Sequence, residues 1–137
     1  MISLTIDNKP LSVEKGTTVL EACRQAGINV PTLCYLERIQ AIGACRVCLV
    51  EIEGVNDLVA SCVMPVSQDM KVHTNNRRVR EARKVVVELL LSEHEGECQT
   101  CDRNEDCELQ NISHDLGITK LRYEGEKAPR FQDHSTA

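Results

Sequence analysis

The stretch "CYLERIQAIGACRVCLVEIEG", residues 34–54, carries three cysteines followed by an apolar run with the alternation of a β-strand. Two residues separate Cys45 from Cys48, which lets one loop present two thiolates to one metal centre. A further cysteine ends a later apolar run. The complete pattern is C-x10-C-x2-C-x13-C, and we call its members the first set: Cys34, Cys45, Cys48 and Cys62.

The compartment decides between metal ligands and disulfides for the eight cysteines. The N-terminus "MISLTIDNKPLSVEKG" has no basic region, no apolar run and no cleavage site, so nothing in it argues for export. No apolar run is long enough to span a bilayer. We therefore expect a cytoplasmic protein without membrane insertion, where clustered cysteines are metal ligands more often than disulfides.

Composition argues against nucleic acid as a partner. The formal net charge is −5, so no basic excess is present to neutralise phosphates. The chain has no Trp, and its three aromatic residues are Tyr35, Tyr123 and Phe131. So few rings provide no platform on which single-stranded bases could stack.

The first part of the chain has the pattern of an α+β domain. Residues 2–6 and 11–13 alternate and predict a β-hairpin, with "NKP" at its turn. Thr18 and Glu21 form a capping box at the start of a helix that Gly27 ends. Strands are expected in 48–54, 57–62 and 70–74. Cys23 falls on the apolar face of the helix, so we interpret it as a core residue and not as a ligand.

The pattern becomes helical after Asn75. Residues 75–94 have a helical period, with an expected apolar stripe of Val79, Ala82, Val86 and Leu89 or Leu90, capped by Thr74 or an Asn. A second helix is expected over 104–116, before Gly117, and a short strand in 118–125, before a flexible tail. The predicted domains are 1–75, 76–118 and 119–137.

The junction of these two helices holds a second group of metal-binding residue types. The pattern is H-x3-C-x2-C-x5-C, and we call its members the second set: His94, Cys98, Cys101 and Cys107. Cys107 is expected in the first turn of the second helix, where the helix dipole stabilises a thiolate. Three cysteines and one histidine suit structural zinc as well as an iron-sulfur cluster, so this spacing leaves both open.

The spacing of the first set likewise fits either an iron-sulfur cluster or structural zinc. Four thiolates hold the 2Fe-2S cluster of plant-type ferredoxins, although the loop there is tighter, C-x4-C-x2-C. Structural zinc also binds four cysteines. Gly43 and Ala44 favour the cluster, because small residues let backbone N–H groups approach its sulfides.

Two stretches, "PTLCYLERIQAIGACRVCLVEIEG" (31–54) and "HEGECQTCDRNEDCELQ" (94–110), resemble a known module. It is the N-terminal module shared by FeFe hydrogenases, NAD-linked formate dehydrogenases and the large iron-sulfur subunit of NADH:quinone oxidoreductase. The resemblance covers roughly residues 1–125 and includes both sets in the same order. "LRYEGEK" (121–127) is more similar to the hydrogenase and formate dehydrogenase branch.

The resemblance implies a β-grasp 2Fe-2S ferredoxin domain followed by a small helical 4Fe-4S domain. Carried over by position, the first set binds one 2Fe-2S cluster. The second set, one histidine and three cysteines, binds one 4Fe-4S cluster. The hydrogenase branch continues into further cluster and catalytic domains that this sequence lacks, so we expect either an excised module or a small subunit.

The expected function is a one-electron relay inside a larger oxidoreductase. The sequence has no glycine-rich nucleotide fingerprint and no nucleophile with a partnered base, so no catalytic residue is predicted. The resemblance favours an NAD(P)-linked FeFe hydrogenase or formate dehydrogenase system. The expected partners are flavin- or NAD(P)-binding chains and a hydrogenase or formate dehydrogenase catalytic chain. The alternatives are a freestanding ferredoxin-like carrier and a structural zinc module.

Overall fold

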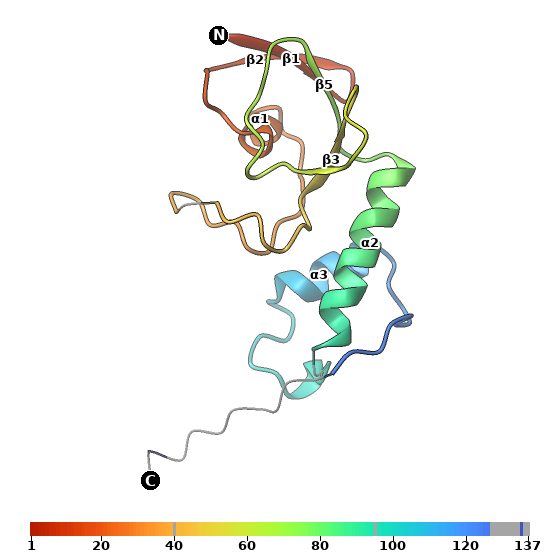
Figure 1. The fold of residues 1–137 in the computed structure, drawn as a ribbon. Coiled ribbons are helices and arrows are strands. Elements are labelled where there is room, and N and C mark those ends of the chain that lie inside the picture. The colour runs from red at the N-terminus through yellow and green to blue at the C-terminus, as the bar shows by residue number, and fades with distance from the viewer. Residues whose placement is uncertain (40, 95, 127–134, 136–137) are drawn as a thin grey trace. The chain divides into compact units, whose positions relative to one another are not determined.

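The structure is a computed structural model that describes residues 1–39, 41–94, 96–126 and 135. It divides into two compact units, Met1–Val86 and the described residues from Val87 onward (Figure 1). In the described part of the chain, no helix is both long enough and apolar enough to cross a membrane.

A five-stranded mixed sheet forms the centre of the first unit. Its strand order is β2-β1-β5-β3-β4, in which β1 pairs parallel with β5 and every other pair is antiparallel. The strands are β1 (Ile2–Ile6), β2 (Lys9–Val13), β3 (Leu49–Ile52), β4 (Val59–Ala60) and β5 (Met70–His73). With helix α1 (Val19–Gln25) packed in the same core, the sheet confirms the predicted α+β class.

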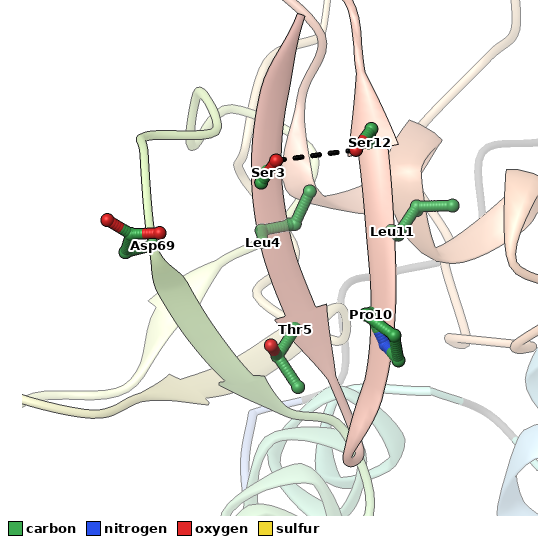
Figure 2. A pocket seen from close by; sticks show the side chains of 7 residues that line it. All are labelled: Ser3, Leu4, Thr5, Pro10, Leu11, Ser12 and Asp69. Carbon is green, nitrogen blue, oxygen red and sulfur yellow. Dashed lines mark hydrogen bonds between the residues drawn. The ribbon is translucent and has the colours of Figure 1, made fainter.

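The β1–β2 hairpin is confirmed, with its turn one residue earlier than expected. Asp7 and Asn8 have φ of 46° and 67°, and such left-handed pairs make the two-residue turns that match strand twist. Across the hairpin the hydroxyls of Ser3 and Ser12 lie 3.4 Å apart (Figure 2). The hollow drawn there, which Asp69 also lines, contains no member of either set.

The predicted capping box begins helix α1. The N–H of Thr18 donates to Oε2 of Glu21 at 2.9 Å, and the N–H of Glu21 donates to Oγ1 of Thr18 at 3.3 Å. The helix ends before Gly27, whose φ is 72°. Cys23 is fully buried in the core, which confirms its interpretation as a packing residue. Burial, with the nearby Asp7 adding, raises the pKa of its thiol to about 11.

Helix α2 (Arg77–Ser92) forms inside the predicted range 75–94, but only Val79 of the predicted apolar stripe is buried. Its cap is Asn76, whose Oδ1 accepts the N–H of Val79 at 2.9 Å. Leu89 and Leu90 are 49% and 38% exposed. Its other buried side chains include Val87 and two charged residues, Arg83 and Glu88. A helix can bury such residues because each charged group finds a polar partner.

The division between the two units lies inside α2, whereas the sequence placed a domain boundary at 75/76. Side chains from the first turns of α2 bind β3. Nη1 of Arg78 donates to Oε1 of Glu51 at 2.8 Å, and the guanidinium of Arg83 donates to the carbonyl of Leu49. These contacts assign the start of the helix to the first unit.

The second unit contains the end of α2, the short 3-10 helix η1 (Cys98–Thr100) and α3 (Glu108–Asp115). Helix α3 ends shortly before Gly117, whose φ is 67°, as expected, but it begins four residues later than predicted. No strand forms within residues 118–126, which corrects a further expectation. There Nε of Arg122 donates to Oε2 of Glu88 at 2.7 Å, so a side-chain contact holds the segment. The predicted flexible tail falls outside the described residues except at Glu126 and Ser135.

Replacing Thr18 with Ala should lower the free energy of unfolding by about 1 kcal/mol, because α1 loses its N-cap. Urea denaturation of the full chain measures the change. Thr17→Ala is the control, because the neighbouring hydroxyl caps no helix, and an equal loss in both variants would contradict the assignment of the cap.

Candidate metal centres

Pairing of β3 with β4 brings two members of the first set together. Cys48 directly precedes β3, and Cys62 lies two residues beyond β4. Because Leu49 pairs with Ala60 in the antiparallel ladder, both cysteines lie at the same end of the strand pair. Ser61 ties this end, donating its N–H and hydroxyl to the carbonyl of Cys48 at 3.2 and 2.7 Å. Each cysteine is 1% exposed.

The other two members lie in the loop between α1 and β3. The N–H of Cys45 donates to Sγ of Cys34 at 3.5 Å. This N–H is the main reason that the pKa of Cys34 lies below its ordinary value, and the side chain of Cys45 and the N–H of Ala44 add to it. The backbone donors of this loop act on the Sγ of Cys34. Their approach to the sulfides of a cluster stays a prediction.

Cys62 lies within electrostatic reach of the other three thiols of the first set. Burial raises the pKa of Cys62 to about 12, and the hydrogen bond and charge of Cys48 raise it further. The charges of Cys34 and Cys45 act in the same direction. Such a group cannot hold four thiolates without a compensating positive charge, which ferric iron supplies. The donor set therefore fits a 2Fe-2S cluster.

The loop of the first set depends on Gly43. Its φ of 66° lies in the left-handed region, which favours glycine. A Cβ at this position would lie 3.1 and 3.2 Å from the two methyl carbons of Val63, the residue after Cys62. Gly43 thus serves both the turn and the close approach of the loop to the strand end.

A cavity of about 580 Å³ in the second unit is lined by every member of the second set. His94 follows the end of α2, Cys98 begins η1, and Cys101 directly follows it. Three acidic residues and one basic residue also line the cavity: Glu93, Glu97, Asp102 and Arg103. Three thiols and one imidazole facing one space are a donor set that fits an iron-sulfur cluster.

The position of Cys107 corrects the sequence prediction. It is the N-cap of α3, with extended φ and ψ of −126° and 119°, and does not lie in the first helical turn. Glu105 has a φ of 68°, which breaks any helix through the preceding residues. Gln110 holds the resulting loop: its Oε1 accepts the N–H of Glu105 at 3.1 Å, and its Nε2 donates to Oδ1 of Asn104 at 3.2 Å.

The two sets differ in exposure. Cys48 and Cys62 of the first set are buried, whereas Cys101 and His94 of the second are exposed and its other two cysteines are partly buried. Within the described residues, no three His, Cys, Asp or Glu side chains converge as they would around a single metal ion.

Two residues at these sites, Gln110 and Arg83, were assigned no role in the sequence analysis. Gln110 is part of the "CELQ" motif but was given no role there. Arg83 lies four residues after Val79 and four before Val87, so a stripe with a spacing of four would have placed it on the buried face.

Comparison with protein families bears on both sets. Residues 1–77, more than half of the chain, match the model described as "2Fe-2S iron-sulfur cluster binding domain". The chain belongs to this 2Fe-2S family. Residues 83–122 match the "NADH-ubiquinone oxidoreductase-G iron-sulfur binding region", a 4Fe-4S region. Both predicted cofactors, one 2Fe-2S and one 4Fe-4S cluster, are therefore confirmed as to type.

Relatives of this 2Fe-2S family member are parts of oxidoreductases. The NADP-reducing hydrogenase subunit HndD of Solidesulfovibrio fructosivorans is 41% identical over 143 residues, covering 100% of this chain and 24% of the relative. The NADH-ubiquinone oxidoreductase 75 kDa subunit of Reclinomonas americana is 42% identical, covering 90% of this chain and 18% of the relative. The chain thus spans about a quarter or less of these two curated relatives. The resemblance drawn from the sequence is confirmed.

A solved structure supports the same relationship. The crystal structure of an NAD+-reducing NiFe-hydrogenase in the H2-reduced state matches with a TM-score of 0.89 and 30% identity. The match covers 98% of this chain and 56% of that chain.

Replacing Gly43 with Ala should lower the free energy of unfolding by about 1–2 kcal/mol, because alanine resists the left-handed conformation. The contact with Val63 adds to this cost. Thermal unfolding and the yield of the 2Fe-2S EPR signal measure the loss. In a Val63→Ala background the same substitution should cost less, and an unchanged cost would contradict the role of the contact.

Proposed function

We propose that this chain is a one-electron relay in a larger oxidoreductase, with the first set binding the 2Fe-2S cluster and the second set binding the 4Fe-4S cluster. One observation carries the proposal: every member of the second set lines one cavity. In the same chain, the other three cysteines of the first set act electrostatically on Cys62. When bound, the clusters supply reversible one-electron transfer.

The protein's own residues hold the thiols and control their surroundings. In the first unit, the β3–β4 pairing keeps Cys48 and Cys62 away from water, and the N–H of Cys45 is aimed at Cys34. Hydrogen bonds to sulfur and burial are the means by which a protein tunes the potential of such a centre. In the second unit, Gln110 holds the loop between Cys101 and Cys107.

The partners we propose are a flavin- or NAD(P)-binding chain on one side and a catalytic chain on the other. The names of the relatives support this choice, since HndD is a subunit of an NADP-reducing hydrogenase. Within this class we favour an NAD(P)-linked FeFe hydrogenase or formate dehydrogenase system, on the similarity of "LRYEGEK". A freestanding carrier would purify without a fixed partner.

A cytoplasmic location is part of the proposal. None of the eight cysteines, all of which the structure describes, forms a disulfide, as is usual for proteins of a reducing compartment. Fractionation of the native cells, followed by detection of the chain, would test the location.

Single cysteine variants test the ligand assignment. After anaerobic purification, Cys48→Ala should lose the 2Fe-2S EPR signal and keep the 4Fe-4S signal, and Cys101→Ala should do the reverse. Measurement at two temperatures separates the clusters, because 2Fe-2S signals persist to higher temperature. Iron and acid-labile sulfide are measured in the same samples.

Cys23→Ala is the matched control, because this cysteine lies in the core and belongs to neither set. It should retain iron and sulfide for both clusters. A colourless wild-type protein that contains zinc and no acid-labile sulfide would refute the relay proposal in favour of a structural zinc module.

Replacing His94 with Cys should lower the reduction potential of the 4Fe-4S cluster. A neutral imidazole is exchanged for a thiolate, and the added negative charge opposes electron uptake. Redox titration followed by EPR measures both clusters in one sample. The 2Fe-2S potential is the internal control, and an unchanged 4Fe-4S potential would argue against His94 as a ligand.

A further inference from the structure

Arg83 is a buried cation in the first unit. It lies on α2, one turn after the fully buried Val79, and is 5% exposed. Its Nε and Nη2 donate to the carbonyl of Leu49 at 3.1 and 2.6 Å. Leu49 directly follows Cys48, so the guanidinium binds the backbone next to a member of the first set.

No carboxylate pairs with this guanidinium in the part of the chain that the structure describes. Other arginines there do form ion pairs, as Arg77 does with Glu81 and Arg78 with Glu51. A buried charge without an opposite charge is costly, and proteins keep such groups mainly where a counter-charge compensates them. An anionic group near Arg83 offsets this cost.

Three groups carry potential negative charge within reach of Arg83: Cys48, Cys23 and Asp7. Burial lowers the pKa of Arg83 to about 10, so it stays protonated at neutral pH, and these groups oppose that shift, Cys48 most of all. Cys23 stays a neutral thiol because its own pKa is raised. Asp7 is already bound by Thr74, whose N–H donates to Oδ1 at 2.8 Å and whose hydroxyl donates to Oδ2.

The donors of Thr74 are neutral, so Asp7 keeps its charge. Cys48, however, acts on Arg83 more strongly and directly precedes the Leu49 carbonyl that the guanidinium binds. Two ferric ions, two sulfides and four thiolates sum to a negative charge, and uptake of one electron makes that charge larger. A fixed cation in a low-dielectric interior stabilises the reduced form more than the oxidised form.

We propose that Arg83 is a positioning residue for the first set, whose buried guanidinium anchors the Cys48–Leu49 backbone and raises the reduction potential of the 2Fe-2S cluster. The inference rests on the proposed binding of that cluster by Cys48. The proposal gives α2 a role in the reduction potential of the first unit's cluster, beyond its hydrogen bonds to β3.

The test is an EPR-monitored redox titration of the full chain with both clusters. In Arg83→Gln, the ratio of reduced to oxidised 2Fe-2S cluster at a fixed potential should fall by about tenfold, which is 59 mV for a one-electron couple. Arg83→Lys keeps the charge and should keep the wild-type ratio. The 4Fe-4S cluster should be unchanged in both variants.

Arg80→Gln is the matched control, since it removes the same charge from an exposed position on the same helix. It should leave the 2Fe-2S ratio unchanged. Thermal unfolding of the same cluster-loaded chains separates stability from potential, because a residue that only packs would lower the melting temperature without moving the ratio.

The outcomes separate this inference from the proposed function. A wild-type chain without a 2Fe-2S signal refutes the ligand assignment. If the wild-type chain gives the 2Fe-2S signal and Arg83→Gln leaves the ratio unshifted, only the role of Arg83 is refuted, and the ligand assignment stands. If Arg83→Gln does not retain the cluster, Arg83→Lys decides: a wild-type ratio supports the charge effect, and a ratio lowered about tenfold overturns it.

Discussion

The antiparallel pairing of β3 with β4 is the constraint on which the first site depends. It places Cys48 and Cys62 at one end of a short ladder, and Ser61 ties that end through two hydrogen bonds to the carbonyl of Cys48. The loop that carries Cys34 and Cys45 then has to approach this end closely. Gly43, facing Val63, makes that approach possible.

The second site depends on local chain geometry instead of a sheet. Its members follow one another across a helix end, a 3-10 turn and a helix N-cap, and the side chain of Gln110 links the loop to α3. Its cysteines are only partly buried or exposed. The two sites thus provide different environments, one dry and close to a buried cation, the other open and lined by carboxylates. Differences in burial and charge of this kind give iron-sulfur clusters different reduction potentials.

Helix α2 shows where the sequence interpretation was too simple. An apolar stripe was expected, yet the buried positions include Arg83 and Glu88, while Leu89 and Leu90 are partly exposed. Each buried charge has a partner remote in sequence, Leu49 for Arg83 and Arg122 for Glu88. One oxygen of Glu88, Oε1, is buried without a hydrogen bond. Hydrophobicity averaged along a helix cannot reveal partners of this kind.

Features that depend on near neighbours in the chain were readable from the residues alone. This class includes the Thr18–Glu21 capping box, the glycines after α1 and α3, the core position of Cys23 and both candidate sets. Helix caps and short ligand spacings depend only on residues close together in the sequence. The family resemblance then identified the cluster types. The start of α3, the missing strand in 118–126 and the burial of Arg83 became visible only in the folded chain. Each of these depends on a contact between residues far apart in sequence or on one left-handed residue, and neither leaves a periodic signal.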